Sequence, residues 1–425
     1  MYLIAGVIIF VSVFYLIITE KVPAPWATMG GGMAMALIGI MNEHDVLQAI
    51  YGGLEIIFLL IGMMIIVHLI SETGVFQWFA IKVAQFVRGN PFKLMALLAI
   101  VTGIASAFLD NVTTILLMIP VTTLLAEQLK ISPYPFIMTE IMAANIGGMA
   151  TLIGDPPQLI IGSEGKLGFN DFLMNTSPLA IIGMIILILN VYFIYGRKME
   201  VPRELRARIM ELDPSRTLKD KKLLKRASIV FLLVIAGFLM NGFIHRGLSV
   251  IAISGAIVLV VMNKIKPEDI LKHVEWDTLF FFMGLFVLVR GIENVNLINI
   301  MGEKIVTLTN GHLGTAVLAI TTFSSALSAI IGNVASAATI SKIIHIIHPT
   351  FSGVVEPTVL WWALSIGTCL GGNFTILASA SNIIAVSAAE KAGCKITFLE
   401  FMKLGTFITF QTIIVGIIYL KLRYM

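Results

Sequence analysis

The sequence predicts an all-α polytopic membrane protein made of two inverted repeats, each with a re-entrant helical hairpin and a broken transmembrane helix. The first observation is composition: the 425 residues are 58% hydrophobic and only 13% charged, whereas a soluble domain carries about 25% charged residues. The second is that apolar runs long enough to cross a bilayer recur along the chain. The third is that motifs of the first half return roughly 222 residues later.

The first repeat covers residues 1–196, with its scaffold spans in 1–71. Its expected elements are three spans, an amphipathic stretch, a hairpin, a broken helix and a closing span, at 2–19, 24–41, 51–71, 75–89, 92–128, 136–162 and 177–195. The hairpin is expected because its apolar run is too long for one span and breaks at Asp110-Asn111. The broken helix is expected at Pro156-Pro157, because proline lacks a backbone donor and clashes with the preceding turn.

A basic linker at 197–226 separates the halves. It holds eleven Lys and Arg residues and five acidic residues, and so carries a net charge of +6 in a chain whose total is +4. The positive-inside rule therefore predicts that the linker lies on the cytoplasmic side of the cytoplasmic membrane. We interpret this local charge as setting the orientation of the chain in the lipid membrane. We therefore expect lipids as partners and no nucleic acid.

The second repeat covers residues 227–425, with its scaffold spans in 227–292. Its expected elements follow the same order, at 227–244, 248–263, 277–292, 295–309, 313–348, 358–388 and 403–422. The segment 106–114 aligns with 328–336, and 147–158 aligns with 371–382. The second hairpin then has its tip near Gly332-Asn333.

The number of membrane crossings predicts how the repeats are related. If hairpins count as no crossing, each repeat contains five full crossings, so the second repeat enters the membrane upside down. The same count predicts that both termini lie outside. Inverted repeats with helices broken near the midplane are the architecture of secondary transporters.

Polar residues at the interruptions form the candidate binding site. A helix that begins inside the membrane offers free backbone donors to an anion, and a helix that ends there offers carbonyls to a cation. Asp110 and Asp155 add carboxylates that bind Na⁺ or carry a proton. Their neighbours add neutral ligands or close backbone approach: Asn111, Thr113, Thr114, Asn145, Gly148, Thr151, Gly154 and Gln158. For each residue taken singly, hydrogen bonding or packing between helices is the alternative interpretation.

The absence of several catalytic and nucleotide-binding motifs disfavours some classes of function. The chain has no nucleotide-binding P-loop, no Gly-x-Ser-x-Gly elbow and no His-Glu-x-x-His, so we expect neither an enzyme nor a bound cofactor. Energy must then come from a gradient of Na⁺ or H⁺, unless a separate ATPase subunit docks. Cys369 and Cys394 have no metal-ligand spacing, so no metal site is expected beyond Na⁺ at Asp110 and Asn111.

These motifs resemble the ion transporter superfamily. The motifs that carry the resemblance are Ser106-Ala-Phe-Leu-Asp-Asn-Val-Thr-Thr114, Asn145-Ile-Gly-Gly148, Ile153-Gly-Asp-Pro-Pro-Gln158, Val274-Glu-Trp-Asp-Thr-Leu-Phe-Phe281, Leu370-Gly-Gly-Asn373 and Ala380-Ser-Asn-Ile-Ile384. They are most similar to the arsenite-permease/NhaD branch, which includes the P protein and has a citrate-transporter-like domain. The resemblance covers essentially the whole chain.

The resemblance implies a homodimer that works by an elevator motion, in which hairpins and broken helices move against the scaffold spans. It also implies binding residues in both repeats. In the first repeat these are Asp110, Asn111, Thr113, Thr151, Gly154, Asp155, Pro156, Pro157 and Gln158. In the second repeat they are Asn333, Asn373, Thr375, Ser379, Ser381 and Asn382.

The sequence departs from that branch in the second hairpin. Gly332 stands where the branch usually has Asp, and Lys342 stands where it has Pro. Two interpretations of Lys342 remain open: it substitutes for a coupled cation, or its side chain snorkels to the outer interface. Glu140 also has two interpretations, a proton carrier inside the membrane or an interfacial capping residue.

We therefore expect an ion-coupled secondary transporter of a small anion or metalloid oxyanion, with arsenite or antimonite as the assignment typical of the branch. Na⁺/H⁺ antiport is the first alternative, and transport of a di- or tricarboxylate such as citrate is the second. An anion channel is an alternative of a different class, because broken helices also build selectivity filters. The missing acid at Gly332 predicts that titratable ion coupling resides in the first repeat.

Overall fold

The computed structural model describes residues 2–19, 21–241, 246–309, 311–351 and 358–425. Within these ranges every regular element is a helix, which confirms the all-α prediction for the described residues. The predicted span 227–244 ends in residues that lie outside these ranges.

The helices of the first half follow the predicted order. They are α1 (Tyr2–Ile18), α2 (Ala24–Leu37), α3 (Glu43–Glu72), α4 (Val75–Phe86), α5 (Pro91–Phe108), α6 (Asn111–Leu129), α7 (Tyr134–Gly148), α8 (Pro156–Gly165), α9 (Phe169–Asn175) and α10 (Ser177–Ile194). The linker contains η1 (Gly196–Lys198), α11 (Arg203–Glu211) and η2 (Pro214–Thr217).

The second half begins with α12, whose first residues belong to the predicted linker. Its helices are α12 (Lys221–Leu239), α14 (Leu248–Met262), α15 (Pro267–Leu271), α16 (Trp276–Asn294), α17 (Leu297–Thr309), α18 (Leu313–Ile331), α19 (Asn333–Ile347), η3 (His348–Phe351), α20 (Val359–Gly371), η4 (Ile376–Ala378), α21 (Ala380–Lys391) and α22 (Phe398–Tyr424). The inverted relation between the halves stays a prediction.

Among the described residues, 6 helices are long and apolar enough to cross a membrane, or up to 7 if the bent pair α16 and α17 counts as one span. The six are α3, α5, α6, α10, α18 and α22. Large apolar side chains such as Leu37, Leu232 and Phe410 are exposed on the outside of the helix bundle. Exposed apolar surface on this scale is expected where lipid takes the place of water.

The helices are interrupted where the sequence predicts. Asp110 caps α6, because its carboxylate accepts a hydrogen bond of 2.7 Å from the backbone N–H of Thr113. Helix α8 begins with Pro156-Pro157, and proline is well suited to the first turn of a helix. Gly332 separates α18 from α19 with a φ of +91°, a conformation that glycine adopts without strain.

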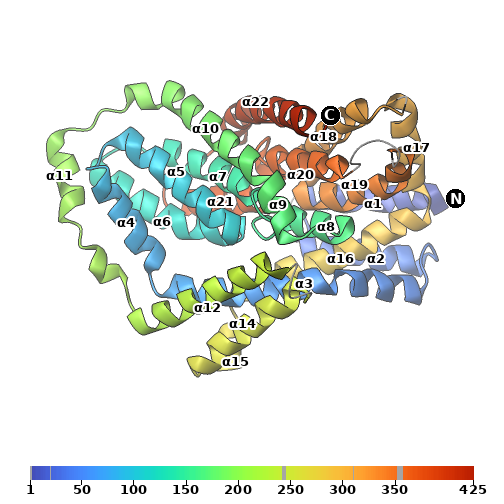
Figure 1. The fold of residues 1–425 in the computed structure, drawn as a ribbon, viewed down its shortest axis with the longest axis horizontal. Helices are drawn as coiled ribbons and strands as arrows, with labels where there is room; N and C mark the ends of the chain where they lie inside the picture. The colour runs from blue at the N-terminus through green and yellow to red at the C-terminus, as the bar shows by residue number, and fades with distance from the viewer. Residues whose placement is uncertain (1, 20, 242–245, 310, 352–357) are drawn as a thin grey trace.

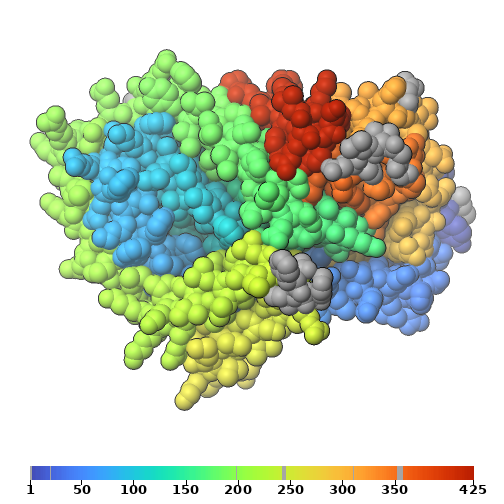
Figure 2. Space-filling view, in the orientation of Figure 1, coloured from blue at the N-terminus to red at the C-terminus, as the bar shows by residue number. Residues whose placement is uncertain are grey.

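The two halves interlock. Helix α16 packs against α2 and α3, α19 packs against α8, and α21 packs against α6, so each of these contacts joins one half to the other. On the face drawn in Figure 2, the green segment α8–α9 lies between the red α22 and the yellow-green α12. Figure 1 shows α11 of the linker and the N-terminus at opposite ends of the molecule.

One close helix contact positions the first interruption. A Cβ atom at Gly147 in α7 would lie 2.1 Å from the carbonyl oxygen of Gly103 in α5. Small residues at such crossings allow two backbones to approach closely. The contact holds α5, and with it the break that precedes α6, against α7.

Gly147→Ala is expected to lower the thermal stability of the purified protein. The added methyl group overlaps the α5 backbone and forces the helices apart, at a cost of about 1–3 kcal/mol. Gly52→Ala is the matched control, because Gly52 is also helical and a Cβ atom there meets nothing within 4 Å. Thermal unfolding in detergent measures both variants, and equal melting temperatures would contradict the close contact.

Candidate functional site

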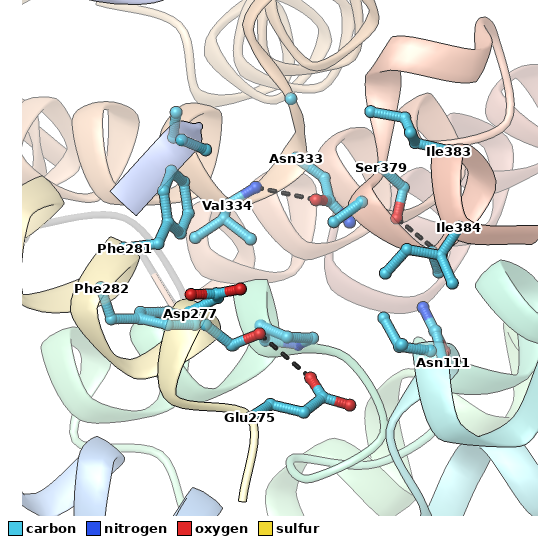
Figure 3. A pocket seen from close by; sticks show the side chains of 18 of the residues that line it. Asn111, Glu275, Asp277, Phe281, Phe282, Asn333, Val334, Ser379, Ile383 and Ile384 are labelled. Carbon is cyan, nitrogen blue, oxygen red and sulfur yellow. Dashed lines mark hydrogen bonds between the residues drawn. The ribbon is translucent and has the colours of Figure 1, made fainter. Parts of the chain in front are cut away.

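A cavity of about 280 Å³ lies between two groups of helices. One wall comes from α1, α2, α3 and the start of α16, and the other comes from the first residues of α6, α8, α19 and α21. Figure 3 shows Glu275 and Asp277 on the first wall, facing Asn111, Asn333 and Ser379 on the second. The second wall therefore gathers four helix starts, two from each half of the chain.

The two helix starts from the first half carry carboxylates. Asp110 caps α6 and occupies a backbone donor of its first turn. Asp155 precedes α8, whose first two residues are prolines and so have no N–H group. Because a capped start and a proline start present few free donors, neither suits an anion. Their carboxylates suit Na⁺ or a proton instead.

The two helix starts from the second half carry no charge. Gly332 precedes α19 and Ser379 precedes α21, and neither makes a side-chain capping hydrogen bond. The first turn of a helix has N–H groups without partners inside the helix, at the positive end of the helix dipole. In α19 the Asn333 side chain already accepts from the Val334 N–H at 2.9 Å. In α21 the N–H of Asn382 donates to the Ser379 carbonyl at 3.1 Å. Each of the two starts therefore keeps N–H groups that an anion can use.

A buried amide cluster joins the halves behind the cavity. The Nδ2 atom of Asn145 donates to Asn373 at 2.8 Å and to Asn382 at 2.9 Å. Its Oδ1 atom accepts from the amide of Asn111 at 3.2 Å. All four side chains are buried, where an unpaired amide is costly. The cluster therefore fixes the interruptions of both halves relative to one another.

A second contact between the halves involves Asp155. The Nδ2 atom of Asn333 lies 3.2 Å from one of its carboxylate oxygens and 3.4 Å from the other. In the amide cluster, Asn111 comes close to Gly148, where a Cβ atom would lie only 2.5 Å from its Oδ1 atom. The glycine at 148 is thus required for packing around Asn111.

The structure divides the predicted site residues into two sets. Those that line the cavity are Asp110, Asn111, Asp155, Pro156, Asn333, Ser379 and Ser381. Those that do not line it are Thr113, Thr114, Asn145, Gly148, Thr151, Gly154, Pro157, Gln158, Asn373, Thr375 and Asn382. Several of these make structural hydrogen bonds: Thr375 donates to the Ala329 carbonyl and Gln158 donates to the Met149 carbonyl, each at 2.9 Å.

Glu140 and Lys342 also lie away from this cavity. Glu140 is buried in α7, and one of its oxygens accepts from Thr122 at 2.6 Å while the other has no partner among the described residues. Both interpretations of Glu140, a proton carrier or an interfacial capping residue, stay predictions. The Nζ atom of Lys342 lies 2.7 Å from Glu164 in α8, and the second oxygen of Glu164 lies 3.0 Å from His345. Lys342 therefore forms an ion pair with the other half of the chain.

Two carboxylates that line the cavity are missing from the predicted set. Glu275 and Asp277 stand at the start of α16, and Glu275 accepts a hydrogen bond of 3.0 Å from Thr278. Both belong to the segment 274–281 that carries part of the family resemblance, which was the available signal. With them, the described residues of the lining include four acidic side chains and no Lys, Arg or His. Binding of Na⁺ at Asp110 and Asn111 stays a prediction.

A second cavity, of about 260 Å³, lies farther along the same helices. Helix α3 contributes Leu60 to the first cavity and Ile56 to the second. Helix α16 contributes Phe281 to the first and Arg290 to the second, and Lys342 lines the second from α19. The boundary between the two helix groups is thus hollow at two levels.

Known proteins are similar to this chain along nearly its whole length. A family model described as "Citrate transporter" matches residues 14–367. A protein of Mycobacterium tuberculosis, named as an uncharacterized transporter, is 36% identical over 99% of this chain and 98% of its own. The human P protein is 30% identical over 98% of this chain and 59% of its own.

Two solved structures have a similar fold. The Alcanivorax borkumensis YdaH transporter aligns with a TM-score of 0.62 and 12% identity, covering 89% of this chain and 86% of its own. MtrF of Neisseria gonorrhoeae, described with a class of antimetabolite efflux pumps, aligns with a TM-score of 0.61 and 12% identity, covering 90% and 83%. At this identity the likeness concerns the fold alone.

Asn145→Ala is expected to destabilise the protein by about 3 kcal/mol, because it leaves partners in both halves buried and unpaired. Asn190→Ala is the matched control: it breaks a half-buried amide pair with Gln411, with distances of 2.9 and 3.3 Å, away from the cavity. That pair should contribute about 1 kcal/mol. Unfolding in detergent measures both, and a loss at Asn145 no larger than at Asn190 would count against the cluster.

Proposed function

Because the chain belongs to the citrate transporter family, we propose that it is a secondary transporter that carries a small di- or tricarboxylate across the membrane together with cations. Membership places the chain in the ion transporter superfamily and confirms the resemblance that its motifs carry. A membrane transporter is thus the general function. The family description favours the carboxylate alternative over the arsenite or antimonite expected first from the resemblance.

The observation that supports this substrate class is the contrast among the four helix starts. Those of the second half, after Gly332 and Ser379, are uncharged and suit the carboxylate of a substrate. Those of the first half carry Asp110 and Asp155, which suit Na⁺ or a proton. One cavity therefore offers an anion position beside a cation position.

Coupling to cations is supported by the charge of the cavity. Among the residues that the structure describes, the lining has four acidic side chains and no basic one. A free anion entering such a cavity is repelled, whereas an anion that enters with cations is not. Coupled entry is therefore the mode of transport that this lining favours.

Alternating access by an elevator motion is part of the proposal. The two cavities lie at two levels of one boundary, between α3 and α16 on one side and α8 and α19 on the other. We propose that hairpins and broken helices move along this boundary in a homodimer. In this proposal the positive-inside rule puts linker 197–226 in the cytoplasm. The odd number of crossings expected in each repeat then puts both termini outside.

A second candidate is cation exchange without an anionic substrate, as in a Na⁺/H⁺ antiporter. The observation in its favour is the same acidic lining, since Glu275 and Asp277 add two carboxylates to those of Asp110 and Asp155. The open start of α21 distinguishes the candidates, because cation exchange has no use for an anion position.

Asp110→Asn is expected to reduce coupled uptake of labelled citrate into proteoliposomes by about tenfold or more, because a charged ligand for the coupling cation is lost. Asn382→Ala, behind the cavity, should have a smaller effect. The assay imposes a Na⁺ or a proton gradient and compares citrate with arsenite. Cation flux without citrate uptake would favour the exchanger, and arsenite uptake alone would restore the first expectation from the resemblance.

Ser379→Asp is expected to abolish citrate uptake, because a carboxylate at the start of α21 occupies the anion position and repels the substrate. Ser379→Asn is the matched control, with a side chain of almost the same shape and no charge. Transport by the Asn variant is expected to exceed that of the Asp variant by about tenfold or more. Equal rates in the two variants would contradict an anion position at α21.

A further inference from the structure

A separate group of metal-ligand side chains lies at the C-terminal end of α3. His68 and Glu72 are four residues apart on this helix and so share one face. His273 approaches from the segment between α15 and α16, and its ring stacks on that of His68 with centroids 3.8 Å apart and an interplanar angle of 15°. The Nε2 atom of His68 lies 3.5 Å from a carboxylate oxygen of Glu72.

The spacing of these side chains fits a single ion. Their ligand atoms all lie within 4.8 Å of one another. A zinc ion with ligands at about 2.0–2.2 Å in tetrahedral geometry needs ligand atoms about 3.4 Å apart. To bind it, the two stacked imidazole rings must rotate out of their parallel arrangement so that both nitrogen lone pairs point at the ion. Glu72 and His273 are exposed, so the ion can enter from solvent and keep a water molecule as its fourth ligand.

The chemistry of the group favours a transition metal over Mg²⁺ or Ca²⁺. Two imidazoles and one carboxylate suit zinc-class ions, whereas Mg²⁺ and Ca²⁺ prefer oxygen ligands throughout. The end of α3 contributes to this preference for a cation, because the helix dipole is negative there. The adjacent Lys272 lies 3.5 Å from Asp269, so its ammonium group already has an acidic partner.

We propose that His68, Glu72 and His273 bind one divalent transition-metal ion of the zinc class. The ion fastens the segment before α16 to the end of α3. Glu275 lies two residues beyond His273 and lines the first cavity. A bound ion therefore holds one wall of that cavity from outside it, and this holds whatever substrate the cavity takes.

The test is a titration of the full chain, purified in detergent without a polyhistidine tag and stripped with a chelator, against ZnCl₂ and separately MgCl₂. Isothermal titration calorimetry is expected to show one Zn²⁺ per chain and no comparable binding of Mg²⁺. His68→Gln, Glu72→Gln and His273→Gln should each weaken Zn²⁺ binding by about tenfold or more. His44→Gln is the matched control, because this histidine lies on the same helix at its opposite end.

Two results would overturn the site: wild-type protein that binds no Zn²⁺ at micromolar concentrations, or His273→Gln protein that binds Zn²⁺ as tightly as wild type. Glu72→Gln and His273→Gln change exposed side chains, so these variants keep the test decisive if His68→Gln fails to fold. Size-exclusion chromatography verifies the fold of each variant. The titration involves no transport, so its outcome is independent of the proposed function.

Discussion

The arrangement around the cavity depends on one constraint: helices interrupted in an apolar interior leave polar groups that must find partners inside the protein. The amide of Asn145 supplies partners for Asn111 in the first hairpin and for Asn373 and Asn382 at the second broken helix. Because the bonds of Asn145 to Asn373 and Asn382 run between the halves, the cavity forms only when both halves are folded together. Neutral amides achieve this without adding charge, which leaves the carboxylates to face the cavity.

The placement of charge then distinguishes four helix starts that face the same cavity. Asp110 and Asp155 put a carboxylate at two of the starts, while Gly332 and Ser379 put no charge at the other two. On the proposed function, this contrast lets one cavity hold an anion and its coupling cation side by side, so neither needs to cross alone. The acids at the start of α16, on the facing wall, strengthen the preference for cations.

The helix interruptions were predictable because Asp, Asn, Gly or Pro within an apolar run indicates that one helix ends there and another begins, as at Asp110. The place of Glu275 in the cavity lining could not be predicted in this way, because Glu275 precedes an uninterrupted apolar run. Only tertiary packing brings α16 opposite the helix starts. The same holds for His68 and His273, which are distant in sequence and meet where α16 packs near α3. Lys342 stood out in the sequence, yet its ion pair with the other half could not be derived from the spacing of residues.

The uneven distribution of carboxylates also means that the halves are not interchangeable. Two copies of the first half would put an acid at all four helix starts of the second wall, and two copies of the second half would put none at these four. The cavity needs one copy of each half, and because the linker joins the halves, both are made in a single round of translation. Fusion into one chain thus fixes the dosage of the halves at one to one, a ratio that two separately made subunits would have to reach through balanced expression.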